Sequence, residues 1–134
     1  MSQTFNSSRA PEPVGPYPHA KRVGDLVFLS GVGPRKRGSS VIPGVDPFDF
    51  ELQCRSCFDN VRAVVEDAGL AWSSVADVTV FLTNMKRDFA SYNRIYGEYF
   101  AGPGNPNPTR TTIEITALPT PIAVEVKATV WAGV

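Results

Sequence analysis

The order of apolar and polar residues along the chain predicts two helices among several strands. Apolar residues recur at helical spacing through residues 50–68 and again through residues 88–100. Alternation with a period of two, which is typical of a strand with one covered face, runs through residues 75–82, 111–116 and 123–131. Gly69 follows the first helical segment and is a good C-terminal stop.

The N-terminal part predicts a β-hairpin. Strand-like runs at residues 17–23 and 26–31 flank a turn at Gly24-Asp25. The second run is apolar at every position from Leu26 to Leu29, which predicts a strand inside the sheet with both faces covered. Residues 32–48 are rich in glycine and proline, carry the triplet Arg35-Lys36-Arg37, and are expected to form a loop.

The second helix has an aromatic face and a candidate cap. Asp88 is predicted to cap its N-terminus. The face consists of Phe89, Tyr92, Ile95, Tyr96, Tyr99 and Phe100. We interpret it as core rather than as a stacking platform, because a helix needs one buried stripe to be stable.

Two cysteines form a Cys-x-x-Cys pair in the first helix. Cys54 and Cys57 share helical spacing with Val61, Val64 and Ala68, which predicts buried thiols rather than a redox or metal motif. A zinc site would need further ligands, and the chain contains a single histidine.

The last two strands carry polar groups on alternate positions. Arg110 shares a face with Thr112 and Glu114, and we expect the opposite face, with Ile113 and Ile115, to meet the helices. Residues 124–130 alternate in the same way. The prediction is a single α+β domain over residues 1–134, a mixed sheet with two helices packed on one face. Its polar face would meet water or another subunit.

Composition excludes several classes of protein. Thirteen basic and thirteen acidic residues cancel, so binding to nucleic acid through phosphate neutralisation is disfavoured. No apolar run approaches the ~20 residues that a membrane span needs. The first eight residues lack the apolar stretch of a secretory signal. We therefore expect a soluble cytoplasmic protein with neither a nucleic acid nor a membrane as partner.

Two charged residues indicate a site for a small carboxylic acid. Arg110 follows the Gly-, Pro- and Asn-rich loop 102–108, and its fork of donors suits both oxygens of a carboxylate. Glu125 lies between two valines and is a candidate to hold a water molecule. The alternative is structural: Arg110 would form a salt bridge with Glu114 or Glu125.

Six short segments in this order resemble the Rid family, the reactive-intermediate deaminases also called YjgF-like proteins. They are Gly15-Pro16-Tyr17, Leu29-Ser30-Gly31, residues 89–100 with Asn93 and Tyr96, Pro108-Thr109-Arg110, Leu118-Pro119 and Val124-Glu125-Val126. The resemblance implies a chorismate-mutase-like fold, a homotrimer with an active cleft at each subunit interface, and hydrolysis without metal or cofactor.

The resemblance also implies roles for individual residues. Arg110 would bind the substrate carboxylate and Glu125 would hold the water, while Tyr17, Ser30, Gly31 and Asn93 match residues lining the cleft. Thr112 departs from the best-known branch, in which many members carry a cysteine two residues after the arginine.

A narrower resemblance points to the 2-aminomuconate deaminase branch. It rests on Tyr17-Pro18-His19, on residues 21–25, on the longer loop through Arg35 and on Thr109-Arg110-Thr111-Thr112. A dicarboxylate needs a second cation, for which His19, Arg35, Lys36 and Arg37 are candidates. The equally weighted alternative is that residues 35–37 form a solvated loop.

The expected function is therefore hydrolysis of a small enamine or imine of a 2-amino acid to the 2-oxo acid and ammonia. A 2-aminomuconate deaminase-like activity is the first expectation, and general clearance of 2-imino acids is the alternative. The rival from another class is a non-catalytic metabolite-binding or chaperone-like trimer.

Overall fold

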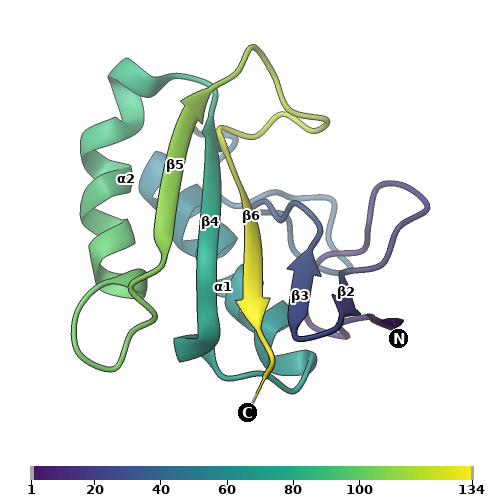
Figure 1. The fold of residues 1–134 in the computed structure, drawn as a ribbon. Coiled ribbons are helices and arrows are strands. Elements are labelled where there is room, and N and C mark those ends of the chain that lie inside the picture. The colour runs from purple at the N-terminus through teal and green to yellow at the C-terminus, as the bar shows by residue number, and fades with distance from the viewer. Residues whose placement is uncertain (1, 134) are drawn as a thin grey trace.

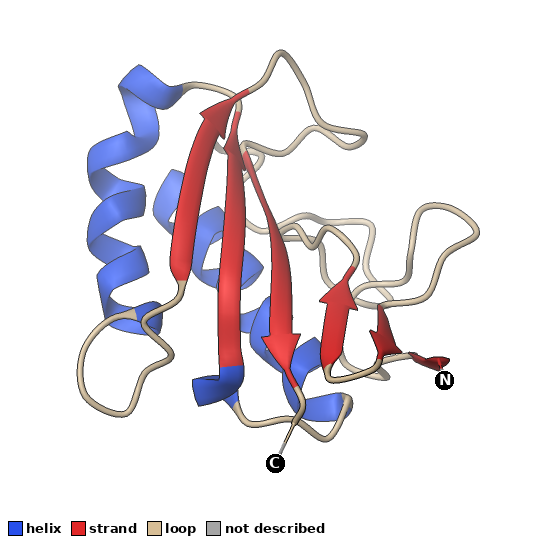
Figure 2. Ribbon diagram, in the orientation of Figure 1, coloured by secondary structure: helices blue, strands red, loops and turns tan. Residues whose placement is uncertain are grey.

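The computed structural model describes residues 2–133, and their strands form one six-stranded sheet (Figures 1 and 2). The strands are β1 (Ser2–Phe5), β2 (Ala20–Val23), β3 (Leu26–Leu29), β4 (Val75–Leu82), β5 (Thr109–Glu114) and β6 (Val124–Trp131). The helices are α1 (Phe50–Asp67) and α2 (Met85–Phe100), with a short 3₁₀ turn at Trp72–Ser74. The strand order is β1-β2-β3-β6-β4-β5, and β4 with β5 is the parallel pair.

Both helices lie on the same face of the sheet (Figure 2). β3 and β4 are each antiparallel to β6, so α1 connects two strands of equal direction, as α2 does between β4 and β5. Such crossovers are right-handed almost without exception, and two of them made in the same direction put both helices on one side. The predicted α+β architecture, with two helices on one face of a mixed sheet, is confirmed.

The core lies between this face and the helices. Phe58 of α1 is fully buried and meets the rings of Tyr99 and Phe100 edge-on at centroid distances of 5.3 and 5.2 Å. Cys54 and Cys57 are also fully buried, and burial raises the pKa of Cys54 to about 12. A thiol with so high a pKa stays protonated and packs as a small apolar group, which confirms the core interpretation.

The prediction for the start of α2 was wrong. Asn84 is the N-cap, and its side chain accepts a hydrogen bond of 3.0 Å from the backbone N–H of Arg87. Asp88 lies inside the first turn, is almost fully buried and pairs with Arg87. Asparagine and aspartate cap equally well, and the helix begins earlier, at Met85, which packs against the core.

The strand predictions need four corrections. The first hairpin strand starts at Ala20 rather than residue 17, and β5 runs two residues earlier than expected. β3 lies inside the sheet, but only Val27 and Leu29 are buried, whereas Leu26 and Phe28 are about 40% exposed. The helices cover one face of the sheet only, so every second side chain of this fully apolar strand is exposed on the face that they leave uncovered. Strand β1 was not foreseen.

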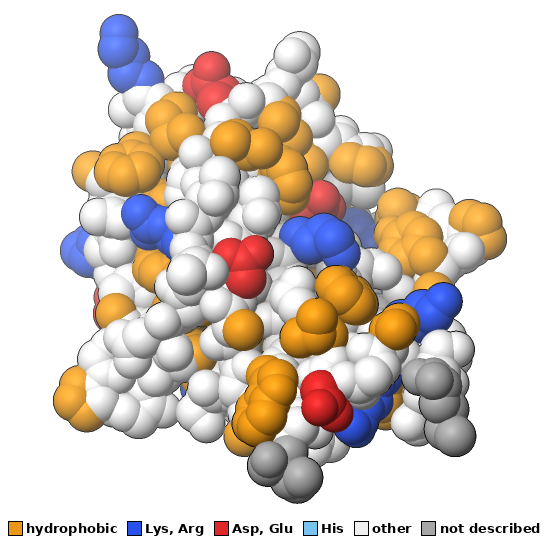
Figure 3. Space-filling model, in the orientation of Figure 1, with side chains coloured by type: hydrophobic (Ala, Val, Ile, Leu, Met, Phe, Trp, Pro, Cys, Tyr) orange, Lys and Arg blue, Asp and Glu red, His pale blue; other side chains and the backbone are white. Residues whose placement is uncertain are grey.

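The face away from the helices, called the open face below, is partly apolar (Figure 3). Its exposed apolar side chains are Val23, Leu26, Phe28, Ile113 and Trp131. Glu125 and Lys127 of β6 lie on the same face. Among residues 2–133, neither helix combines the length and the apolar character that crossing a membrane requires.

We expect Asn84→Ala to lower the free energy of unfolding by about 1 kcal/mol, because a backbone donor of α2 loses its partner. Asn84→Asp keeps the acceptor and should stay close to the wild type. Urea unfolding followed by circular dichroism measures both variants. Equal stability of the alanine and aspartate variants would contradict the assignment of the cap.

Candidate active site

A cavity of about 160 Å³ opens beside β6. Its volume is similar to the ~150 Å³ of an engineered cavity that holds benzene, which indicates a small ligand. Three segments form its walls: the N-terminal segment 10–19, the segment 30–35 that follows β3, and residues 119–125. The predicted site residues on its wall are Tyr17, His19, Ser30, Gly31, Arg35 and Glu125.

Glu125 supplies the carboxylate of the cavity. It is half-buried on the open face of β6, opposite Phe81 of β4. Desolvation raises the pKa of Glu125, and the positive charge of Arg35 opposes this rise. A carboxyl group with a raised pKa holds a proton more readily, which suits a general base that takes a proton from a bound water.

The backbone of residues 30–32 fits closely around Glu125. A Cβ atom on Gly31 would lie 2.8 Å from the Oε2 atom of Glu125, so a side chain here would displace the carboxylate. Val32 and Val126 exchange backbone hydrogen bonds of 2.8 and 2.9 Å, which fix the segment against β6. The Ser30 hydroxyl donates to the Pro18 carbonyl at 2.7 Å and joins the segment to the N-terminal wall.

The structure changes the interpretation of His19, which was predicted as a candidate second cation. Its Nδ1 atom accepts the backbone N–H of Ser7 at 2.9 Å, and its Nε2 atom lies 2.8 Å from the Pro11 carbonyl. An Nδ1 that accepts carries no proton, so the ring is neutral with its proton on Nε2. His19 therefore holds the wall of the cavity.

The triplet 35–37 divides between two roles. Arg37 donates to the carbonyls of Ser7 and Ala10, both at 2.8 Å, and so fixes the N-terminal segment. Arg35 donates through Nη2 to the Glu12 carbonyl at 2.6 Å and lies on the cavity wall. Lys36 is exposed. The triplet is thus neither wholly a solvated loop nor wholly a cationic site.

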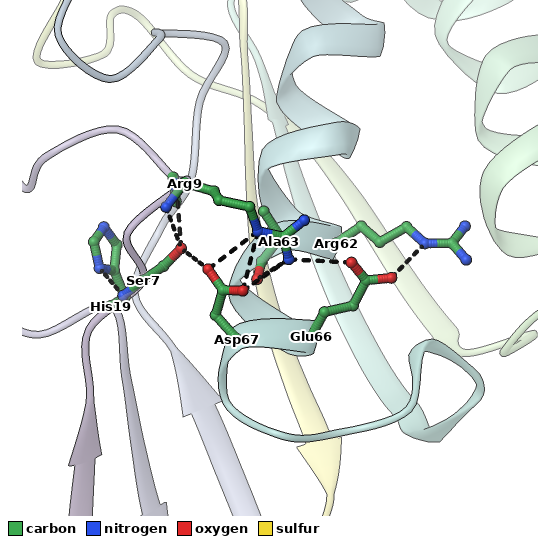
Figure 4. A network of polar contacts seen from close by, with 8 residues as sticks. Ser7, Arg9, His19, Arg62, Ala63, Glu66 and Asp67 are labelled. Atoms are coloured by element: carbon green, nitrogen blue, oxygen red, sulfur yellow. Dashed lines mark hydrogen bonds and ion pairs between the residues drawn. The ribbon is translucent and has the colours of Figure 1, made fainter.

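A polar network anchors the N-terminal wall to the end of α1 (Figure 4). The Ser7 hydroxyl donates to Asp67 at 2.6 Å, and Arg9 pairs with Asp67 at 2.8 Å and with Glu66 at 3.2 Å. The Arg9 guanidinium keeps the pKa of Asp67 below its ordinary value. The wall that carries Tyr17 is therefore tied to a helix.

Arg110 lies on the other side of the sheet, contrary to expectation. It pairs with Val78 of β4, which is fully buried beneath the helices, whereas Glu125 pairs with Phe81 on the open face. Partners in register point to the same side, so Arg110 and Glu125 point to opposite faces. The prediction that Ile113 meets the helices was wrong, since it is 39% exposed on the open face.

Arg110 is held against α2. Its Nη1 donates to Asn93 Oδ1 at 2.9 Å, and its guanidinium lies 5.1 and 4.6 Å from the ring centroids of Tyr92 and Tyr96. Thr112 and Tyr92 share a hydrogen bond of 2.6 Å between their hydroxyls. Within residues 2–133 the predicted alternative, a salt bridge to Glu114 or Glu125, is not formed.

The two tyrosines were interpreted from the sequence only as core. Their rings also support the guanidinium through cation–π contacts. Spacing of i and i+4 around Asn93, on a helix that leads to the strand of Arg110, is the signal that could have identified them. Within the described residues no three histidine, cysteine, aspartate or glutamate side chains gather as a metal site.

Comparison with known proteins agrees with this fold. The family profile described as Endoribonuclease L-PSP matches residues 7–132. The 2-iminobutanoate/2-iminopropanoate deaminase of Escherichia coli is 32% identical over 128 residues, 96% of either chain. A RutC family protein of Pyrococcus horikoshii is 33% identical over 129 residues, again 96% of either chain.

Solved structures give the same result. The crystal structure of E. coli TdcF with bound serine matches with a TM-score of 0.88 and 31% identity, covering 98% of this chain and 99% of that one. The E. coli YjgF structure matches with a TM-score of 0.86 and 30% identity, covering 96% and 98%. The chain therefore belongs to the Rid/YjgF family, also called the RutC or L-PSP family. The chorismate-mutase-like fold is confirmed, whereas none of these comparisons bears on the 2-aminomuconate branch.

We expect Glu125→Gln to stabilise the protein more at pH 7 than at pH 4. The raised pKa of Glu125 means that the folded state binds a proton more tightly than the unfolded state does, so its contribution to stability is lost as pH rises through the folded pKa. Glutamine removes this loss. Thermal unfolding of both proteins at several pH values measures it, and a constant difference in Tm would contradict the desolvation of Glu125.

Proposed function

We propose that this chain is a 2-imino acid deaminase, which hydrolyses the imine of a small 2-amino acid to the 2-oxo acid and ammonia. The observation that carries the proposal is Glu125, a half-buried carboxyl group with a raised pKa on the wall of a small cavity. Membership of the Rid/YjgF family and the name of the E. coli 2-iminobutanoate/2-iminopropanoate deaminase support the reaction class.

The chemistry needs an oriented water and a fixed substrate. Glu125 accepts a proton as the water oxygen bonds to C2 of the protonated imine. The proton passes to the amine nitrogen, the C2–N bond breaks with ammonia as leaving group, and the remaining hydroxyl loses its proton to give the 2-oxo acid. A general base contributes roughly 10² to 10⁴-fold to such a step. The Ser30 N–H already donates to the His19 carbonyl at 2.9 Å, so the backbone of Gly31 on the cavity wall is the proposed contact for the substrate.

Arg110 is the proposed grip for the substrate carboxylate. Asn93 and the two tyrosine rings fix the plane of its guanidinium and engage Nη1, which leaves the Nε–Nη2 edge for a ligand. That edge suits two carboxylate oxygens at once. Thr112 lies two residues further along the same face.

The site is proposed to form between two copies of the chain, in a homotrimer. Within one chain Arg110 and Glu125 point to opposite faces of the sheet, so they serve one substrate only if a second copy brings its Arg110 to the cavity. The exposed apolar side chains of the open face supply surface for such contact.

We expect Arg110→Lys and Glu125→Gln each to lose most of kcat/KM for 2-iminopropanoate. Lysine is a point charge that cannot reproduce the two-pronged grip, and glutamine cannot accept the proton. Glu125→Gln should still bind a 2-oxo acid. The measurement is ammonia release from freshly generated imine. Unchanged kcat/KM in Arg110→Lys would refute the grip.

Mixing the two variants tests the shared site. After random exchange in equal amounts, about a quarter of the interfaces join an intact Arg110 to an intact Glu125, so activity should return to about a quarter of wild type. Absence of any recovery would place the whole site in one chain. If the wild type itself releases no ammonia yet is stabilised by 2-oxo acids, the protein is the non-catalytic metabolite-binding trimer.

A second candidate substrate is a dicarboxylate such as 2-aminomuconate. The observation that favours it is Arg35, a cation on the same cavity wall as Glu125, whose guanidinium makes one hydrogen bond within residues 2–133, to the Glu12 carbonyl. A second carboxylate bound there would gain charge-assisted hydrogen bonds worth roughly 1.5–3 kcal/mol each.

For this candidate we expect Arg35→Gln to raise KM for the dicarboxylate roughly ten- to hundredfold while leaving KM for 2-iminopropanoate nearly unchanged. Lys36→Gln removes the neighbouring exposed charge and is the matched control. Rates should be taken at a pH where Glu125 is ionised in every variant. An equal change of KM for both substrates would remove the case for the dicarboxylate.

A further inference from the structure

One edge of α1 holds the backbone of the segment that follows β3. Cys57 donates through Sγ to the Val32 carbonyl at 3.2 Å, and the Ser56 hydroxyl donates to the Pro34 carbonyl at 2.8 Å. Asn60 donates through Nδ2 to two carbonyls, those of Gly33 at 2.9 Å and Arg35 at 2.7 Å. Every carbonyl from residue 32 to residue 35 therefore has a side-chain donor from this helix.

Asn60 holds two of these four carbonyls, whereas Ser56 and Cys57 hold one each. Residues 33–35 lie outside the strands, so the sheet gives their carbonyls no partners. The amide of Asn60 has two N–H donors on one atom, and both are used. Half-buried carbonyls without partners are costly, so this contact stabilises the observed place of Gly33 and Arg35 in the segment.

The segment leads from Asn60 to the cavity. The main chain of Arg35 is fixed by Asn60, and its side chain reaches the cavity wall, where Nη2 meets the Glu12 carbonyl. Glu125 lies on the same wall. Asn60 thus holds the main chain of Arg35, whose side chain shares the cavity wall with Glu125 and acts on the carboxylate through its charge, although Asn60 itself does not line the cavity.

We propose that Asn60 is a positioning residue of the active site, which keeps the Arg35 guanidinium beside Glu125 by holding the carbonyls of Gly33 and Arg35. The inference rests on the proposed function for its consequence in catalysis. The contacts of Asn60 with Gly33 and Arg35 lie within one chain and do not depend on the assembly. Loss of the Asn60 contact would let residues 33–35 move and withdraw a positive charge from the carboxylate.

The other groups near Glu125 do not depend on Asn60. On the N-terminal wall, both ring nitrogens of His19 contact the backbone, at Ser7 and Pro11, and Tyr17 carries an uncharged hydroxyl. On β6 itself, Lys127 donates its amine to the Leu29 carbonyl. From α1, Cys57 is a buried thiol. Arg35 is the cation whose position follows from Asn60, and its charge acts to lower the pKa of Glu125.

The experiment follows the titration of the Glu125 carboxyl group by ¹³C NMR in the full-length protein. We expect Asn60→Ala to move the midpoint to higher pH, as Arg35→Gln does. The double variant Asn60→Ala/Arg35→Gln should move no further than Arg35→Gln alone, because Asn60 acts through Arg35. Alanine is the best helix former, so the variant is expected to fold. Asn60→Leu, which keeps the size without the donors, is the second test.

Activity gives an independent measurement. The acid limb of kcat/KM for 2-iminopropanoate should move with the NMR midpoint, so Asn60→Ala loses activity several-fold on that limb and keeps it at higher pH. KM for this substrate should change little, since Asn60 acts on the base. A uniform loss of kcat/KM at every pH would indicate only a damaged fold.

Asp49→Ala is the matched control. It removes the N-cap of α1, whose side chain accepts from Leu52 N at 3.1 Å, and lies eleven residues or about 16 Å along the helix from Asn60. It should lower Tm without moving the Glu125 midpoint. The proposal is overturned if Asn60→Ala lowers Tm and leaves the midpoint unchanged, or if the double variant exceeds Arg35→Gln. Because the titration needs no turnover, a wild type without deaminase activity would refute the proposed function and leave this test valid.

Discussion

The covering of a single sheet face by both helices is the constraint on which the rest of the structure depends. Two crossovers made in the same direction put α1 and α2 on one side, so alternate residues along a strand face either the helices or the open face. On β6 the alternation turns Glu125 away from the helices. On β5 it turns Arg110 toward them, where α2 provides Asn93 and two aromatic rings. The candidate grip and the candidate base are therefore separated by the sheet itself.

This separation suggests a role for the open face in contact between copies of the chain. A catalytic pair divided by a sheet is useful only if copies of the chain meet, and the open face carries apolar side chains as well as charged ones. The proposed assembly and the proposed chemistry thus depend on the same geometry. Each helix has a second role beside core packing, since α2 supports the arginine and the polar edge of α1 holds the segment beside the glutamate.

Much of the fold was predictable from local pattern. Spacing identified both helices and the two long strands, and it placed Cys54 and Cys57 in the core, because a helix must bury one stripe. The errors arose where two local signals were equally good. Asparagine and aspartate are both strong caps, and in the folded chain Asn84 caps the helix while Asp88 is buried and paired with Arg87. The apolar run of β3 could not show that one of its faces would have no helix over it.

The sequence by itself determined both helices, most of the strands, the family and the residue types of the candidate site, because periodicity and short motifs are local properties of the chain. Only the tertiary structure decided which of those residues meet. In the folded chain His19 supports the cavity wall through two backbone contacts. Arg35 and Arg37 donate to different carbonyls and so have different roles. Arg110 and Glu125 point to opposite faces of the sheet. These outcomes depend on strand register and on crossovers between distant segments, and neither is encoded in the spacing of nearby residues.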